Sequence, residues 1–145
     1  MSKVDFNPDE PLLTVSKLNA WYGAAHILFD VDLNVRRGEV VALMGRNGAG
    51  KSTTLKSIMG LMEKSKGDIH FMGSKISGRQ SFEIARRGVG FVPEDRRVFS
   101  DLTVTQNLEV GRQPARTWPD GKSAFRWTPE DLYKLFPNLG GMQDR

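Results

Sequence analysis

The residues with the clearest chemistry lie between Gly45 and Ser52, where the sequence is Gly-Arg-Asn-Gly-Ala-Gly-Lys-Ser. This segment matches the phosphate-binding pattern GxxxxGK[ST], whose glycines let the backbone curl until successive N–H groups face phosphate oxygens. Lys51 would then reach the β and γ phosphates of a nucleotide, and the Ser52 hydroxyl would bind Mg²⁺. A helix that starts at the loop adds the positive end of its dipole. The segment therefore predicts a nucleotide-binding loop.

The elements on either side of the loop support this prediction. Residues 39–44 form an apolar run typical of a strand that is buried on both faces in a parallel sheet. After the loop, apolar residues recur at i, i+3, i+4 and i+7 and predict one face of a helix that starts near Lys51. These residues are Leu55, Ile58, Met59 and Met62. The order strand, loop, helix disfavours the alternative of a glycine-rich surface turn before an ordinary helix.

Further elements are predicted on both sides of this unit. Residues 12–18 and 27–35 alternate in the manner of antiparallel strands, and Lys66-Gly67 interrupts the pattern before a strand at 68–72. A hairpin turn at Gly73-Ser74, a helix at 81–87 and a buried strand at 89–92 are expected next. Thr103 and Gln106 form a capping box that predicts a helix through Val110. The segment 112–127 is expected to be a loop or linker. A last helix is predicted to start at Thr128-Pro129 and to end at Pro137.

Composition indicates a soluble globular domain. The chain has 145 residues, of which 39% are apolar and 26% are charged. Residues 1–10 lack the apolar core of a signal peptide, and no apolar run approaches the roughly 18 residues of a membrane span. We therefore expect a cytoplasmic protein without direct membrane insertion. Cysteine is absent, and the two isolated histidines suggest no metal site.

The net charge of +4 raises the question of nucleic-acid binding. The basic residues come as scattered pairs at 36–37, 86–87 and 96–97, without the interleaved aromatics of a single-strand binding groove. A solvated or partner-facing surface is favoured, and we expect no nucleic-acid partner.

At this point the residues resemble the ATP-binding subunits of ABC transporters, over nearly the whole chain from Leu12 onward. Together with Thr53, the loop has a sequence that resembles the form of this motif in that family. Residues 92–99, followed by 102–104 and 107–108, are similar to the branch that drives branched-chain amino acid importers. The resemblance implies an α/β P-loop NTPase core with an N-terminal antiparallel β portion. Residues 1–11 would be a tail, 12–100 the catalytic-core portion and 101–145 the beginning of the helical subdomain, within one partial domain at 12–145.

The resemblance also implies a site for ATP and Mg²⁺. Tyr22 lies where the family places an aromatic ring that stacks on adenine. Trp21 is the other candidate for this stacking, and the alternative for Tyr22 is simple packing. Glu94 aligns with a glutamine that touches Mg²⁺ in most members, and its alternative is a solvated loop acid. The metal residues are then Ser52 and Glu94. The nucleotide-binding residues are Tyr22, Gly45, Arg46, Asn47, Gly48, Ala49, Gly50, Lys51, Ser52 and Thr53.

Partners follow from the same resemblance. They are the transmembrane permease subunits of an importer and a second ATP-binding subunit, so we expect a peripheral location at the inner face of the membrane. Arg96, Arg97 and Phe99 are candidates for the permease contact.

The chain departs from the family after the predicted helical segments. Full members continue, after the helical subdomain, with an LSGGQ-like motif, an apolar run that ends in Asp-Glu and a downstream histidine, and the sequence has none of these after its predicted helices. Leu139-Gly140-Gly141-Met142-Gln143 imitates the first motif but lacks the serine. We therefore expect no catalytic residue within this chain, and a truncated domain without its C-terminal half that is poorly stable alone. It would bind ATP-Mg weakly without hydrolysing it.

Two other functions stay open from the residues. One is a non-hydrolytic protein that docks on membrane subunits, and the other is a small P-loop kinase or GTPase. The GTPase alternative is weakened because the sequence contains no Asn-Lys-x-Asp motif.

Overall fold

The computed structural model describes residues 11–95, 98–117 and 121–144. Their contacts separate them into two parts, a first part that ends at Phe91 and a second part that begins at Val92. The predicted phosphate loop belongs to the first part. The predicted helices after residue 100 belong to the second.

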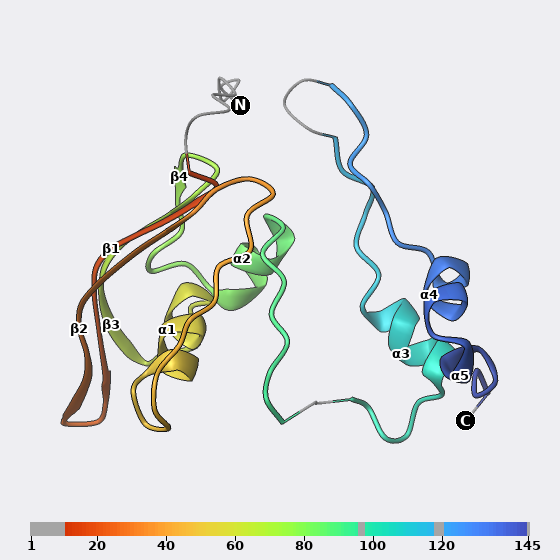
Figure 1. The fold of residues 1–145 in the computed structure, drawn as a ribbon, viewed down its shortest axis with the longest axis horizontal. Coiled ribbons are helices and arrows are strands. Elements are labelled where there is room, and N and C mark those ends of the chain that lie inside the picture. Colours follow the sequence, from red (N-terminus) through yellow and green to blue (C-terminus); the bar gives the residue numbers. More distant parts are fainter. Residues whose placement is uncertain (1–10, 96–97, 118–120, 145) are drawn as a thin grey trace. The chain divides into compact units, whose positions relative to one another are not determined.

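The first part is built on an antiparallel sheet with the strand order β2-β1-β3-β4. Its strands are β1 (Leu13–Tyr22), β2 (Ala25–Val35), β3 (Lys64–Phe71) and β4 (Ser74–Lys75) (Figure 1). Val15, Leu18 and Ala20 of β1 lie in the core with residues of β2 and β3, because an irregularity between Ser16 and Asn19 shifts the alternation of the strand by one residue. The antiparallel strands predicted at 12–18 and 27–35 are confirmed, and so are the strand near 68–72 and its hairpin turn.

The predicted interruption at Lys66-Gly67 is wrong, because both residues lie inside β3. Gly67 has φ of 126°, and a Cβ at this position would lie 2.6 Å from the Lys17 carbonyl oxygen. The register between β1 and β3 shifts at this point, between Ser16 and Asn19. The extra residue is in β1, where Lys17 and Leu18 face Gly67, so the glycine makes room for a bulge of β1 while β3 continues.

Two helices pack in the first part (Figure 1). The helix α1 (Lys51–Ile58) starts at the predicted residue. The predicted apolar face is only partly right, since Ile58 and Met59 are buried but Leu55 is exposed and the helix ends before Met62. Its buried residues are Thr53, Thr54, Ser57 and Ile58. The helix α2 (Ser81–Arg86) confirms the second predicted helix and contributes Ile84 to the core.

The two predicted buried strands at 39–44 and 89–92 are wrong for this structure. Neither segment is a strand, and no described residue pairs with either of them. Val40 is 96% exposed and Val92 is 90% exposed. A strand needs a neighbour to satisfy its N–H and C=O groups, so apolar sequence alone does not produce one here.

The second part contains three short helices, α3 (Val104–Val110), α4 (Pro129–Leu135) and α5 (Pro137–Gly140), within its described residues. Thr103 with Gln106 and Thr128 with Asp131 form complete capping boxes, so both predicted helix starts are confirmed. Pro137 follows the end of α4 as predicted and also opens α5. Between α3 and α4 the chain turns back on itself through an antiparallel bridge between Thr117 and Ser123.

Candidate functional site

The loop between Gly45 and Ser52 has a curled backbone that depends on its glycines. Gly48 and Gly50 have φ of 83° and 88°, in the left-handed region that costs other residues energy. Gly50 is also buried, and a Cβ there would lie 2.6 Å from Leu28 Cδ2. Gly50 therefore meets two demands, the backbone turn into α1 and the close approach of the loop to β2.

The side chain of Lys51 folds back over the loop. Its Nζ donates hydrogen bonds to the carbonyl oxygens of Gly45, at 2.7 Å, and Arg46, at 2.9 Å. The Arg46 oxygen also accepts a hydrogen bond from the Ala49 N–H, at 3.1 Å, which closes the same turn. An ammonium group has three donors, so one donor stays available for a phosphate oxygen.

The first turn of α1 presents backbone donors without a protein cap. No side chain caps the helix, and no acidic residue lies in its first turn. An anion is the group that such a terminus favours. The Ser52 side chain is exposed beside these donors, whereas Thr53 is buried. Thr53 would therefore contact a phosphate through its backbone N–H and not through its side chain.

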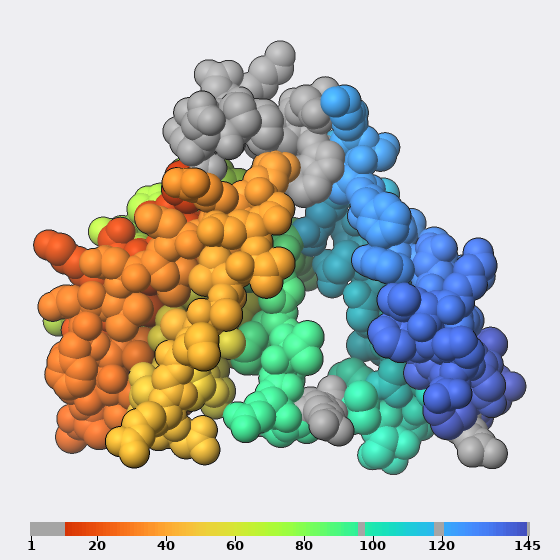
Figure 2. All heavy atoms as spheres, viewed as in Figure 1, coloured from red at the N-terminus to blue at the C-terminus, as the bar shows by residue number. Residues whose placement is uncertain are grey.

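Residues 36–49 are all exposed, and their orange to yellow atoms lie at the surface in Figure 2. The structure thus brings together the loop residues that the sequence predicts, on an open surface. The Ala49 Cβ lies 3.2 Å from where a Cβ on Gly45 would be, which keeps that position narrow as well.

The two candidate aromatic residues at the end of β1 differ in their surroundings. The Trp21 ring stacks on His26, with centroids 4.4 Å apart and planes at 13°, and the Lys64 Nζ lies 4.9 Å from its centroid. His26 is fixed by a 2.9 Å hydrogen bond between its Nε2 and the Asn19 Oδ1. Tyr22 is 50% exposed. Packing therefore occupies Trp21, and Tyr22 is the ring that remains accessible to a base.

Glu94 is exposed and lies in a turn of the second part. Its role beside Ser52 stays a prediction. Within the residues described, no group of three or more His, Cys, Asp or Glu side chains could hold a metal ion. A Mg²⁺ ion here would take its other ligands from the nucleotide and water, which is usual for this ion.

The structural role of Asn107 was not predicted from the sequence, in which this residue contributed only to the family resemblance. Its Nδ2 donates to the carbonyl oxygens of Phe99, Leu102 and Thr103, each at 3.0 Å, and its Oδ1 accepts the Phe99 N–H at 2.9 Å. These bonds fix the exposed Phe99, a candidate for partner contact, to α3. An asparagine four residues after a capping threonine is the signal that would have found it. The other two candidates, Arg96 and Arg97, lie outside the described residues.

Comparison with known proteins adds three findings. A sequence model of the family described as ABC transporter matches residues 28–144. The chain is 38% identical over 128 residues to BraG of Pseudomonas aeruginosa, a high-affinity branched-chain amino acid transport ATP-binding protein, with 88% of this chain and 53% of BraG covered. It is 35% identical over 132 residues to RbsA of Caldanaerobacter subterraneus, a ribose import ATP-binding protein, with 90% of this chain and 27% of RbsA covered.

The fold is similar to that of a solved nucleotide-free ATP-binding cassette from an ABC transporter. The TM-score is 0.67 at 24% identity, over 94% of this chain and 57% of that one. The chain spans about half the length of BraG and of this cassette. No helix among the described residues is long and apolar enough to span a bilayer.

Proposed function

Because the chain belongs to the ABC transporter family, we propose that it binds Mg²⁺-ATP as part of the ATP-binding subunit of an importer. The observation that carries the proposal is the loop from Gly45 to Ser52. Two glycines in the left-handed region curl its backbone, the Lys51 ammonium lies over it, and α1 begins directly behind it without a cap. These three features suit a phosphate chain.

Each residue then has a distinct task. The backbone N–H groups from Gly45 to Thr53 hold phosphate oxygens, apart from that of Ala49, which is bonded to the Arg46 oxygen. Lys51 adds its free donor, and the Ser52 hydroxyl binds Mg²⁺. Tyr22 stacks on the adenine, which is supported by its exposure and by the packing of Trp21 against His26. Glu94 accepts hydrogen bonds from water on the metal. Bound Mg²⁺ neutralises phosphate charge and needs no dedicated protein cage.

The cargo we propose is a branched-chain amino acid. The support is the likeness to BraG and the spelling of residues 92–99. The likeness to a ribose import protein is only slightly lower in identity, so the loop and its surroundings do not discriminate between cargoes. Cargo is selected by other subunits, which is why ATP-binding subunits of different importers resemble one another.

The chain alone is proposed to bind ATP without turning it over. Phosphoryl transfer to water needs a positioned base and stabilisation of charge around the γ phosphate. The sequence contains neither an LSGGQ-like motif nor an apolar run that ends in Asp-Glu. Permease subunits and a second ATP-binding subunit are the proposed partners, with Phe99 at the permease contact and the protein at the inner face of the membrane.

The test compares Mg²⁺-ATP binding by the wild-type chain, Lys51→Ala and Lys56→Ala in a calorimetric titration. Lys56 is an exposed lysine on the same helix, so its variant matches the loss of charge and of side chain. A charge-assisted hydrogen bond is worth about 1.5–3 kcal/mol, so Lys51→Ala should weaken ATP binding by about tenfold to a hundredfold. Lys56→Ala should leave it nearly unchanged.

Equal affinities for the two variants would contradict the proposed site. Phosphate release is followed in the same samples. Release by the wild-type chain that disappears in Lys51→Ala would overturn the statement that the chain does not hydrolyse ATP, while leaving the binding site intact.

A further inference from the structure

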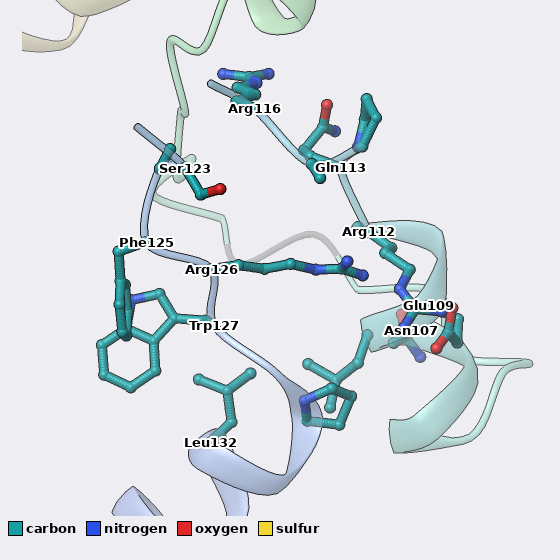
Figure 3. A pocket seen from close by; sticks show the side chains of 16 residues that line it. Asn107, Glu109, Arg112, Gln113, Arg116, Ser123, Phe125, Arg126, Trp127 and Leu132 are labelled. Carbon is teal, nitrogen blue, oxygen red and sulfur yellow. Dashed lines mark hydrogen bonds and ion pairs between the residues drawn. The ribbon is translucent and has the colours of Figure 1, made fainter. Parts of the chain in front are cut away.

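The pocket between the end of α3 and the start of α4 does not form a site for one ligand. Arg126, Phe125 and Trp127 are among its lining residues. The Arg126 side chain lies on the opposite side of the backbone from the two rings (Figure 3). A small molecule held by the rings would therefore not reach the guanidinium. In the first part of the chain, by contrast, charged and aromatic side chains share one face of the sheet.

This face, the outer face, is the side of β1, β2 and β3 that points away from α1 and α2 (Figure 1). The opposite side packs on the two helices through core residues such as Leu18, Ile58 and Ile84. Asn19 and Trp21 alternate with the buried Ala20 along β1 and so belong to the outer face. Its residues are Asn19, Trp21, His26, Phe29, Asp30, Asp32, Lys64 and Lys66.

An aromatic cluster occupies the end of the outer face beside the hairpin between β1 and β2. Trp21 stacks on His26, and the Phe29 and His26 ring centroids are 3.9 Å apart. The Lys64 Nζ of β3 lies 4.9 Å from the Trp21 ring centroid. Phe29 is 65% exposed, so the cluster presents an apolar surface to a partner.

Charges of opposite sign lie on the two sides of β1. Lys66 of β3 pairs with Asn19 in the antiparallel register. From the β2 side, the Asp30 Oδ1 accepts a 2.8 Å hydrogen bond from the Asn19 Nδ2. Lys66 and Asp30 are both exposed, and they lie at the same height along the sheet, one strand to each side of Asn19.

Neighbouring residues extend this separation of charge. Lys64 adds to the basic side on β3, and Asp32 adds to the acidic side on β2. Asp68, the acid of β3, forms an ion pair with Lys75 of β4. The outer face therefore has a basic side on β3 and an acidic side on β2.

We propose that two copies of this chain associate through their outer faces, with a two-fold axis along β1. Such an axis keeps each residue at its height along the strand and exchanges the two sides of the face. It brings Lys66 of one copy over the partner's Asp30, and the reverse contact forms at the same time. Lys64 comes to lie over the partner's aromatic cluster, where a cation is favoured. Stacked sheets lie about 10 Å apart, a gap that a lysine and an aspartate side chain bridge together.

The size of the outer face limits the strength of this dimer. Three strands of about ten residues cover roughly 14 Å by 33 Å, so the two copies together would bury on the order of 900 Å². Interfaces of this size are weak and transient. Gly50 of the phosphate loop approaches Leu28 on the core side of the sheet, so the dimer leaves the loop free.

The experiment is sedimentation velocity of the nucleotide-free chain from about 1 μM to 1 mM. The wild-type chain should dimerise within this range. Lys66→Glu and Asp30→Lys each place like charges opposite one another twice, so each variant should dimerise about tenfold more weakly. Lys56→Glu reverses an exposed lysine of α1, on the other side of the sheet, and should not change the dimer.

An equimolar mixture of Lys66→Glu and Asp30→Lys should dimerise as the wild-type chain does, because both charge pairs are restored between the two copies. Circular dichroism of each variant checks the sheet. Asp30→Asn keeps an oxygen for the Asn19 amide and should still weaken the dimer through the loss of charge alone. A monomer at every concentration, equal effects of Lys66→Glu and Lys56→Glu, or a mixture no more associated than its two components would overturn the proposal.

Discussion

Gly50→Ala is expected to damage the core of the first part and the phosphate loop together. The new Cβ would lie 2.6 Å from Leu28 Cδ2, well inside van der Waals contact. Leu28 is 3% exposed and belongs to the core cluster, so it has little room to move away. The alanine would also have to adopt φ of 88°.

Gly48→Ala separates these two effects. Gly48 has φ of 83°, close to that of Gly50, but a Cβ there meets no atom within 4 Å. The left-handed backbone costs alanine about 1–2 kcal/mol, so Gly48→Ala should cost about that amount. Overpacking adds about 1–3 kcal/mol, so Gly50→Ala should cost about 2–5 kcal/mol.

The assay is urea unfolding of each variant without nucleotide, followed by ATP titration of the folded protein. Leu28→Ala provides a further control, since it removes the atom that the new Cβ would meet. In that background, Gly50→Ala should cost only the backbone term of about 1–2 kcal/mol. The reasoning is refuted if Gly50→Ala and Gly48→Ala cost the same, or if Leu28→Ala brings no relief.

Three other predictions follow from single residues. Tyr22→Ala should weaken ATP binding about tenfold and Tyr22→Phe should retain it, because base stacking on a ring is worth about 1–3 kcal/mol. Trp21→Ala should lower the thermal stability of the chain and leave its affinity for ATP nearly unchanged. Asn107→Ala removes the two N–H donors and the Oδ1 acceptor of the amide and should cost the second part about 1–3 kcal/mol, with faster hydrogen exchange at the Phe99 amide. Asn138→Ala, at an exposed residue, should have no such effect. Hydrogen bonds from Thr128 hold the pKa of Asp131 below its ordinary value of 3.8. The carboxylate therefore stabilises α4 at pH values above 3.8, and this stabilisation is lost as the pH falls through the lowered pKa. Asp131→Asn should destabilise α4 at neutral pH but not in strong acid. Circular dichroism measures the helix, and an NMR titration follows the carboxyl group.

Local signals in the sequence predicted the elements that local interactions form. The capping boxes at Thr103 and Thr128 involve residues three positions apart, and both helices begin where these boxes predict. The glycine pattern of the phosphate loop also acts within a few residues. The alternation of β1 and β2 was readable because one hairpin brings these strands together.

Predictions that depend on distant residues fared less well. Residues 39–44 have the composition of a buried strand, yet a strand forms only where another segment pairs with it, and no described residue does so. The burial of Thr53 and Thr54 on α1 was missed, because a threonine is polar and becomes suited to a core when its hydroxyl bonds within the helix. The Thr54 hydroxyl, for example, donates to the Gly50 oxygen at 3.0 Å. The antiparallel bridge between Thr117 and Ser123 was equally hidden, since residues 112–127 were expected to be a loop or linker.

The support of the phosphate loop explains how its geometry exists without a strand at 39–44. Gly50 is packed against Leu28 of β2, and α1 lies against β1 and β2 through its buried face. The Lys51 ammonium closes the loop through the Gly45 and Arg46 oxygens. The loop is therefore held from the side of the antiparallel sheet and from within.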